Sequence, residues 1–360
     1  MSILVIDPHG ARHDAALPAL RQALDPASAA RVLGGVLAAR GVLAPSLTRI
    51  AVWRHKPGRR CLVAYSFGHG ETPELVVLGK VRAKGADART YRLQRHLWRH
   101  GFGSRGGTSV GVPEPIGLSP EFAAWWQRRV LGVDGTTAVW SADGATACRR
   151  FADAIHALHA AQPPQDSRRH SLSDELSILE ARLASLAGER PEWAARLEAA
   201  LAGARRRASA LGARPERLVH RDYYPDQVMA GDDRTYLLDL DLCAIGDPAL
   251  DVGNFAAHLI EHAVRVTGEP GPAEELVGAF VERYLEHAGP DHGPAVEAFT
   301  TLALLRLVQI AWTKPERRSS AAHLLEHCEE RVATIVRTVA SCGRNAGIDL
   351  TPDRSAATPP

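Results

Sequence analysis

The sequence has few cysteines, and their arrangement does not suggest a cross-link. Five occur among 360 residues, at positions 61, 148, 243, 328 and 342, an odd number without a CxxC pair. Small secreted domains held by disulfides carry cysteine more densely and in even numbers, and zinc sites need closely spaced ligands. The pattern argues against a disulfide framework or a zinc knuckle and is typical of a protein in a reducing compartment.

The chain also lacks an excess of charge of one sign. Lys and Arg total 43 and Asp and Glu total 41, which leaves a net charge of +2. Proteins that bind nucleic acid or membranes over a broad surface usually carry a marked basic excess. The N-terminus shows no basic start followed by an apolar run, and we see no apolar stretch of about 18 residues, so we expect no signal peptide and no membrane span. We therefore expect a cytoplasmic protein without a nucleic-acid or membrane partner.

Lysine is scarce as well. Among the 43 basic residues only Lys56, Lys80, Lys84 and Lys314 are lysines. Lys80 lies in the apolar run ELVVLGKV, which predicts a central strand and an internal role for this ammonium group. The chain has no GxxxxGK[ST] loop, so it lacks the sequence signature of a P-loop nucleotide site, and the turn at 55–60 does not read GxGxxG.

Hydrophobic periodicity differs between the two halves of the chain. The first half predicts strands at 49–53, 61–65 and 74–81, with a Pro-Gly turn at 55–60 between the first two. A helix is predicted at 87–100. These segments indicate a small sheet followed by one helix.

The second half is mostly helical. Short strands at 123–126 and 129–130 are followed by glycine residues at 132–135, which we interpret as a hinge. One or two long helices are predicted in 173–211, and further helices in 251–342. A β-rich N-terminal half followed by a mostly helical C-terminal half predicts an α+β fold.

The most informative stretch, LVHRDYYPDQVMAGDDRTYLLDLDLCAIGDPALD, runs from Leu218 to Asp251. Two short apolar segments, 228–229 and 236–238, separate its polar clusters. Those clusters contain His220, Asp222, Gln227, Asp239 and Asp241.

An acidic residue on a loop, an amide five positions later and a carboxylate after a hydrophobic strand suit phosphoryl transfer. Asp222 can orient an acceptor hydroxyl and take its proton. The side-chain oxygens of Gln227 and Asp239 are hard ligands of the kind that Mg²⁺ prefers. Asp241 shares a strand face with Asp239 if the strand continues, which would make it a further ligand; we interpret it rather as a polar turn residue.

These residues resemble the aminoglycoside phosphotransferase family of the protein-kinase-like superfamily. The family pattern reads His-x-Asp-x-x-x-x-Asn, then a hydrophobic strand ending in Asp, then Gly-Asp-Pro-x-x-x-Asp. In this chain the corresponding pieces are His220-Arg221-Asp222, Leu237-Leu238-Asp239 and Gly246-Asp247-Pro248 followed by Asp251. The resemblance implies a two-lobe protein-kinase-like fold, with a β-rich N-lobe that binds nucleotide and a mostly helical C-lobe.

The resemblance also implies roles for single residues. Lys80 would bond the α- and β-phosphates of a nucleotide. Arg59 and Arg60 lie where the phosphate-covering hairpin would be, although a solvated hairpin tip explains them equally well. His220 would brace the catalytic loop, and Asp251 would anchor it through backbone hydrogen bonds.

Two features depart from the family pattern. Gln227 stands where the family has Asn; it keeps the amide oxygen but adds a methylene group. The predicted helix at 87–100 contains no Glu to pair with Lys80, since its one carboxylate, Asp87, lies where a helix cap is expected. Lys80 would then be held by Asp239 or by the nucleotide alone.

We divide the chain into four segments. Residues 1–45 form an N-terminal helical extension, 46–131 the N-lobe and 132–344 the C-lobe with the catalytic loop, metal site and acceptor pocket. The tail, 345–360, is predicted to be disordered.

We interpret the chain as a Mg²⁺-dependent phosphotransferase that moves the γ-phosphoryl group of ATP, or of GTP, to a small molecule, with Asp222 as base. A sugar, an amino alcohol or an aminoglycoside-like compound would supply the hydroxyl. The alternative is a nucleotide-binding regulatory protein with little transferase activity, which the two departures favour. A Ser/Thr protein kinase is a weaker interpretation, because no APE motif or activation segment occurs between Asp239 and Asp251.

Overall fold

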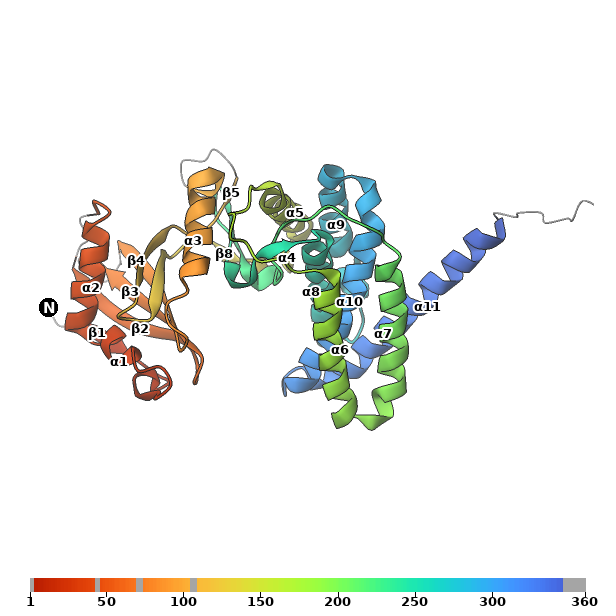
Figure 1. Ribbon diagram of the computed structural model, residues 1–360, viewed down its shortest axis with the longest axis horizontal. Helices are drawn as coiled ribbons and strands as arrows, with labels where there is room; N and C mark the ends of the chain where they lie inside the picture. The colour runs from red at the N-terminus through yellow and green to blue at the C-terminus, as the bar shows by residue number, and fades with distance from the viewer. Residues whose placement is uncertain (1–2, 43–45, 69–73, 104–108, 346–360) are drawn as a thin grey trace, which may run out of the picture.

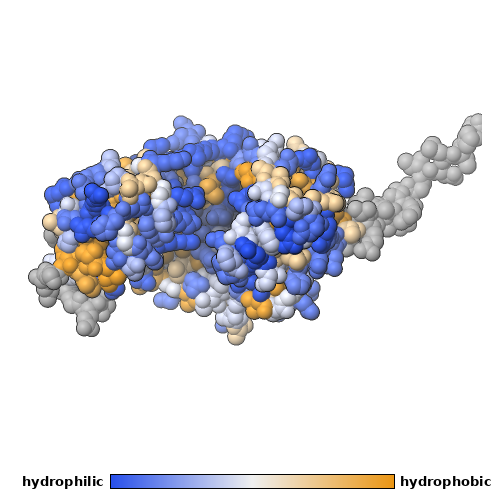
Figure 2. All heavy atoms as spheres, turned by 90° about the horizontal axis from the view of Figure 1, so that it is seen from below, coloured by the Kyte–Doolittle hydropathy of each residue, from blue (hydrophilic) through white to orange (hydrophobic). Residues whose placement is uncertain are grey.

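The computed structural model describes residues 3–42, 46–68, 74–103 and 109–345, with side chains as far as residue 333. It has two lobes, a sheet-rich N-terminal lobe and a mostly helical C-terminal lobe (Figure 1). This arrangement confirms the predicted α+β, two-lobe organisation. The surface is hollowed between the lobes, and hydrophilic side chains surround the hollow (Figure 2).

The N-lobe is built on a six-stranded sheet whose order is β1-β2-β3-β4-β7-β6. Its strands are β1 (Leu4–Ile6), β2 (Leu47–Lys56), β3 (Arg60–Phe67), β4 (Leu75–Arg82), β6 (Pro115–Ser119) and β7 (Ala124–Arg128). The three predicted strands at 49–53, 61–65 and 74–81 are confirmed as β2, β3 and β4, and β4 is central as expected. Alternate residues of β4 are buried, so Lys80 and Arg82 point to the same face.

The N-terminal segment is part of this sheet, which corrects the prediction of a purely helical extension at 1–45. Strand β1 pairs in parallel with β2, and helices α1 (Leu20–Ala23) and α2 (Pro26–Ala38) follow it. Asp25 caps α2 by accepting a hydrogen bond from the backbone N–H of Ser28 at 2.9 Å. The apolar side of α2 shares a buried core with the sheet, so this segment is integral to the lobe.

Helix α3 (Ala88–Leu97) follows β4 and corresponds to the helix predicted at 87–100. Asp87 is its N-cap, as expected, and accepts from the Thr90 N–H at 3.0 Å. The helix ends earlier than predicted because the chain turns at 98–102, where Gly101 has φ 105°. The strand predicted at 129–130 does not form, because β7 ends at Arg128.

The C-lobe contains eight helices among the described residues. They are α4 (Gly135–Val139), α5 (Gly144–Ala160), α6 (Leu172–Glu189), α7 (Ala194–Ser209), α8 (Ala249–Thr267), α9 (Glu274–Ala288), α10 (Gly293–Thr313) and α11 (Ala321–Asn345). The prediction of one or two helices in 173–211 is confirmed as two, α6 and α7, which a turn at Pro191–Trp193 separates. Since α11 reaches Asn345, only 346–360 of the predicted disordered tail lie outside the described residues.

We expected no apolar stretch of about 18 residues, and this expectation is wrong for helix α10. The helical segment Pro290–Thr313 is long enough to cross a membrane, and its most apolar window of 18 residues has a mean hydropathy of 1.4. Within the protein, 72% of its most apolar window is buried against other helices. A buried core helix of a folded domain explains this composition.

Short strands outside the six-stranded sheet carry the motif at 218–251. Strands β10 (Val228–Ala230) and β11 (Thr235–Leu237) form an antiparallel hairpin flanked by β8 (Val133–Asp134) and β5 (Val110–Gly111). Strand β9 (Arg217–Val219) pairs with β12 (Ala244–Gly246). The two predicted apolar segments of the motif are therefore strands.

The glycine segment predicted as a hinge packs directly against this hairpin. Gly132 has φ 150°, and a Cβ atom on it would lie 2.3 Å from the carbonyl oxygen of Ala230. A Cβ atom on Gly135 would lie 2.2 Å from the carbonyl oxygen of Pro225. Only glycine fits such approaches, so these residues bring the connection between the lobes against the motif. The lobe boundaries at 131 and 132 stay a prediction.

A close approach between α8 and α10 gives a test of the C-lobe packing. A Cβ atom on Gly253 would lie 2.5 Å from the backbone nitrogen of Thr300, which cannot move without shifting α10. We expect Gly253→Ala to lower the free energy of unfolding by about 1–3 kcal/mol. Gly278→Ala, in α9 with no atom nearer than 3.9 Å, is the control and should raise it by about 0.5–1 kcal/mol. Denaturant unfolding measures both, and equal effects would contradict the packing.

Candidate active site

The loop between β9 and β10 is held by one buried carboxylate. Asp251, in the first turn of α8, is fully buried. Its Oδ2 accepts a hydrogen bond from the His220 N–H and its Oδ1 accepts one from the Arg221 N–H, each at 2.6 Å. His159 Nε2 lies 3.0 Å from Oδ2 and adds a third partner. Because Arg221 has φ 70°, an unfavourable conformation for arginine, these bonds hold the loop in a shape that it would not adopt alone.

His220 connects this loop to the hairpin. Its Nε2 donates a hydrogen bond to the carbonyl oxygen of Leu238 at 2.7 Å, and the ring is fully buried. Its Nδ1 has no hydrogen-bond partner within the described part of the chain. The imidazole therefore fixes the backbone immediately before Asp239.

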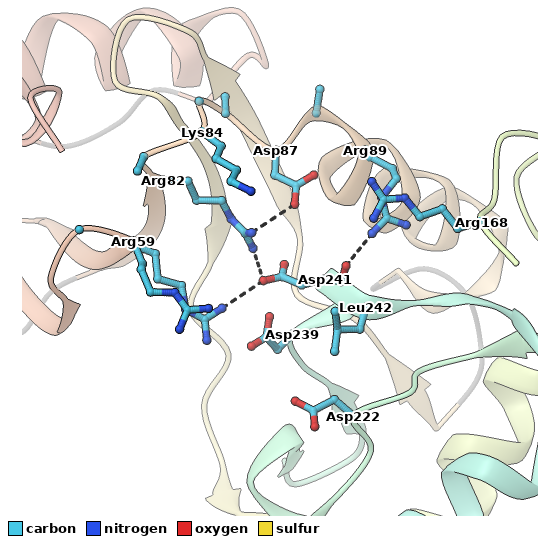
Figure 3. Close-up of a pocket in the computed structure, with 16 residues that line it drawn as sticks. Arg59, Arg82, Lys84, Asp87, Arg89, Arg168, Asp222, Asp239, Asp241 and Leu242 are labelled. Carbon is cyan, nitrogen blue, oxygen red and sulfur yellow. Dashed lines mark hydrogen bonds and ion pairs between the residues drawn. The ribbon is translucent and has the colours of Figure 1, made fainter. Parts of the chain in front are cut away.

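Asp222 follows two residues later, and its carboxylate points into a pocket between the lobes (Figure 3). No hydrogen bond or ion pair to this carboxylate is found among the residues that the structure describes. Burial raises the pKa of Asp222, which the nearby His220 and Arg306 partly oppose. A carboxylate that is unpaired and more basic than usual can accept a proton from a hydroxyl group.

Gln227 and Asp239 lie at the same end of the β10–β11 hairpin. Val228 pairs with Leu237, and the Leu238 N–H donates to the Gln227 carbonyl oxygen at 2.9 Å. Gln227 Nε2 donates to the Tyr224 hydroxyl at 3.2 Å, which leaves the amide oxygen for another partner. The fold thus brings together the two oxygen ligands predicted from the sequence.

Lys80 from the N-lobe approaches Asp239 from the opposite side. Its Nζ lies 2.9 Å from Asp239 Oδ1 and 3.5 Å from Asp241 Oδ1. Burial raises the pKa of Asp239, but the Lys80 ammonium and the neighbouring hydrogen bonds outweigh burial and hold that pKa below its ordinary value. Lys80 also lies 5.3 Å from the centre of the Trp125 ring, its partner on β7. The carboxylate partner of Lys80 therefore comes from the motif rather than from helix α3.

Asp241 does not continue the strand, and it does more than form a turn. Asp239 has φ 53° and ψ 57°, in the left-handed region, and a 3₁₀ turn at Leu240–Leu242 follows it. The Asp241 carboxylate forms a close ion pair with Arg82 and lies 3.5 Å from Arg60 Nη1. The strand does not continue, because the backbone reverses at Asp239 and turns the Asp241 carboxylate toward the N-lobe cations; the interpretation of Asp241 as a turn residue agrees with the 3₁₀ turn.

The β2–β3 turn places Arg59 and Arg60 at the mouth of this pocket. Gly58 has φ 70° there, and its N–H donates to Asp14 Oδ2 at 2.8 Å. The side chain of Arg59 is exposed and has no partner within the described residues, while Arg60 reaches Asp241. This position is compatible with both interpretations of the two arginines, as phosphate ligands and as part of a solvated hairpin tip.

The pocket has a volume of about 780 Å³ and is open to solvent between the lobes. Its charged lining residues are Arg59, Arg60, Arg82, Lys84, Asp87, Arg89, Arg168, Asp222, Asp239 and Asp241. Figure 3 shows the three motif carboxylates on one side and basic side chains from the N-lobe facing them. A cavity that combines cations with carboxylates suits a polyanion that is bound together with a metal ion.

Sequence reasoning missed several of these residues. Arg82 lies two positions after Lys80 on the same strand, so strand alternation could have placed both on one face. No sequence pattern marks Arg89 or Arg168. Arg89 lies in the first turn of α3 and Arg168 in a loop, and only the fold brings these segments close to the motif. Lys84 was noted only for the scarcity of lysine.

The ligands expected for magnesium fit this geometry. No group of three or more His, Cys, Asp or Glu side chains that could hold a metal occurs among the described residues. Mg²⁺ in nucleotide sites commonly takes one or two protein oxygens and completes its shell with phosphates and water. Asp239 and the free amide oxygen of Gln227 suit that role. Asp239 and Asp241 are each paired with an N-lobe cation, and Asp241 Oδ1 has no hydrogen-bond partner among the described residues, so Asp241 stays a less favoured candidate ligand.

Comparisons with known proteins agree with this arrangement. A model of the phosphotransferase enzyme family matches residues 81–299. Comparison with the curated proteins finds no match. Choline kinase from Cryptosporidium parvum Iowa II is 15% identical with a TM-score of 0.58, over 80% of this chain and 90% of that chain.

Two phosphotransferases also have similar structures. A thermostable mutant of aminoglycoside phosphotransferase APH(4)-Ia, in a ternary complex with AMP-PNP and hygromycin B, is 16% identical with a TM-score of 0.54 and coverage of 84% and 97%. Spectinomycin phosphotransferase APH(9)-Ia, in complex with ADP and spectinomycin, is 10% identical with a TM-score of 0.54 and coverage of 84% and 96%. At these identities the likeness shows the fold, which is the expected protein-kinase-like one.

The buried Asp251 carboxylate gives a test of the loop anchor. In Asp251→Asn the amide nitrogen cannot accept a hydrogen bond, so one of the two loop N–H groups loses its partner in a buried site. We expect the free energy of unfolding to fall by about 1–3 kcal/mol. The exposed substitution Asp233→Asn is the matched control and should change it little. Two variants of equal stability would show that Asp251 does not anchor the loop.

Proposed function

This chain belongs to the phosphotransferase enzyme family, and we propose that it is a small-molecule kinase that uses ATP, or GTP, and Mg²⁺. The observation that carries the proposal is that Asp222 and Asp239 line one pocket between the lobes, and that Asp239 pairs with Lys80 of the N-lobe. A proton acceptor, a metal ligand and a phosphate-binding cation are the parts that phosphoryl transfer needs. We further propose a cytoplasmic location.

Asp222 acts on the acceptor in this proposal. The acceptor hydroxyl donates a hydrogen bond to the Asp222 carboxylate, and its oxygen attacks the γ-phosphorus. The bond between the γ-phosphorus and the bridging oxygen breaks, the nucleoside diphosphate leaves, and the hydroxyl proton passes to Asp222. The raised pKa of Asp222 and the absence of any partner among the described side chains support this role.

The nucleotide phosphates are bound by cations of the N-lobe. We assign Lys80 to the α- and β-phosphates, with Arg59 and Arg60 covering them from the β2–β3 turn. Asp239 and Gln227 would hold Mg²⁺, which neutralises phosphate charge when it is bound. The similar APH(4)-Ia and APH(9)-Ia structures contain AMP-PNP and ADP, which supports a nucleotide in the corresponding cleft.

The acceptor is a small hydroxylated molecule in this proposal. Similar structures belong to proteins whose names specify choline, and to complexes with hygromycin B and spectinomycin. An amino alcohol, a sugar and an aminoglycoside-like compound are the candidate classes. Since one fold serves all of these acceptors, the fold does not choose among them.

A second candidate is a nucleotide-binding regulatory protein with little transferase activity. The observation that favours it is Gln227, because the added methylene group, compared with the Asn of the family pattern, changes the reach of the metal ligand. One measurement distinguishes the two candidate functions. Nucleotide consumption is measured with each member of a library of hydroxylated metabolites: a kinase consumes nucleotide in the presence of its acceptor, and a regulatory protein consumes little with any of them.

The role of Asp222 as base can be tested by substitution. Asp222→Asn should lower acceptor phosphorylation by about 10²–10⁴-fold, since the amide cannot take a proton. Nucleotide affinity should stay close to that of the wild type, because Asp222 contacts no phosphate ligand among the described residues. Turnover and nucleotide binding are measured on the same purified protein. Wild-type turnover by the folded variant would reject the assignment.

The role of Gln227 as a metal ligand can be tested in the same way. Gln227→Asn should keep or raise turnover, because Mg²⁺ requires the amide oxygen more than a given side-chain length. Gln227→Ala, the control, should raise the Mg²⁺ concentration needed for half-maximal turnover. If Gln227→Ala matches the wild type in turnover and in Mg²⁺ dependence, Gln227 is not a ligand and the regulatory candidate gains support.

A further inference from the structure

The loop that carries Asp239 is held from helix α3 by a single guanidinium group. Arg89, in the first turn of α3, donates from Nη2 to the Asp241 carbonyl oxygen at 2.6 Å and from Nη1 to the Cys243 carbonyl oxygen at 3.1 Å. These two carbonyl groups belong to the 3₁₀ turn that follows Asp239 and to the residue at its end. One planar side chain thus clamps both ends of a short backbone segment.

The clamp lies beside a backbone conformation that needs support. Asp239 has φ 53° and ψ 57°, which is costly for a residue with a Cβ atom. Such residues persist where the surrounding structure fixes them. On its N-terminal side, Asp239 is fixed by the bond from His220 to the Leu238 carbonyl oxygen. On its C-terminal side, Arg89 supplies the corresponding constraint.

A second connection joins the same three elements through side chains. Asp241 forms its close ion pair with Arg82 of β4, and Arg82 Nη1 lies 3.6 Å from Asp87, the N-cap of α3 (Figure 3). Asp87 in turn bonds Thr90 at two atoms. The strand, the helix and the loop are therefore joined in a closed ring, with the backbone bonds of Arg89 as one side.

We infer that Arg89 is a positioning residue, which holds the loop at 239–243 so that the Asp239 carboxylate faces the metal. The inference rests on the proposed function, since it concerns how well a nucleotide binds with Mg²⁺. It also gives helix α3 a role that its composition did not predict. The helix has no Glu for Lys80, and Lys80 takes both of its carboxylate partners from the loop that Arg89 holds.

The test compares Arg89→Gln with Arg92→Gln, two identical substitutions three residues apart in α3. Arg92 pairs with Asp166 at 3.2 Å on the surface, where the two side chains are 55% and 60% exposed. For each protein the affinity for ATP, or for GTP if the wild type prefers it, is measured in EDTA and again with saturating Mg²⁺. Thermal unfolding of both variants separates a loss of stability from a loss of positioning.

In the wild type and in Arg92→Gln, we expect Mg²⁺ to raise nucleotide affinity. In Arg89→Gln the affinity in EDTA should be unchanged, and the gain from Mg²⁺ should fall by about 10-fold or more, because a displaced Asp239 is a weaker ligand. Arg89→Lys, which keeps the positive charge and can still donate hydrogen bonds but lacks the planar fork, should recover part of the gain.

Three results would overturn the inference. If Mg²⁺ raises nucleotide affinity equally in Arg89→Gln and Arg92→Gln, Arg89 does not position Asp239. A lower affinity in EDTA with a normal Mg²⁺ gain would make Arg89 a direct phosphate ligand instead. If the wild type binds no nucleotide, the proposed function fails, and this inference fails with it; in the first two cases the proposed function is unaffected.

Discussion

The candidate active site depends on the hydrogen bonds that the Asp251 carboxylate accepts. A fully buried carboxylate is costly unless its oxygens are satisfied, and here two backbone N–H groups and one histidine satisfy them. The geometry of the loop follows from these bonds, since the left-handed Arg221 lies between His220 and Asp222. His220 then reaches the hairpin and fixes Leu238. One buried anion on helix α8 therefore determines where both the proposed base and the proposed metal ligand lie.

Ion pairs connect the two lobes across the cleft. Lys80 and Arg82 extend from one face of β4 and pair with Asp239 and Asp241, so the N-lobe cations and the carboxylates neutralise each other. In the proposed function, a nucleotide carrying Mg²⁺ would bring both charges at once, because its phosphates would pair with Lys80 and its metal would be held by Asp239. Such an exchange would leave little unpaired charge in the cleft, which would favour binding of the two together over either alone.

The sequence predicted the fold and the motif better than the contacts around the motif. Periodicity located β2, β3, β4 and the helices because burial imposes a regular pattern, and the spacing from His220 to Asp251 predicted which polar residues would meet. The left-handed turn at Asp239 was missed, since no glycine or proline marks it. Arg89 was missed because it bonds backbone carbonyl groups, which every residue has. The strand β1 was too short for its pattern to stand out from the helical segment that follows it.

The amide at position 227 shows how a departure from a family pattern can keep the chemistry of a site. The added methylene of Gln, compared with Asn, would by itself leave the amide free to rotate. The bond from Nε2 to the Tyr224 hydroxyl removes that freedom and leaves the oxygen as the unpaired end. Tyr224 is in turn fixed by stacking on His258, with 4.4 Å between the ring centres and 17° between the planes. A longer ligand that is held at its far end by a packed ring can present its oxygen as firmly as a shorter one, so the substitution alone is not evidence of a lost metal site.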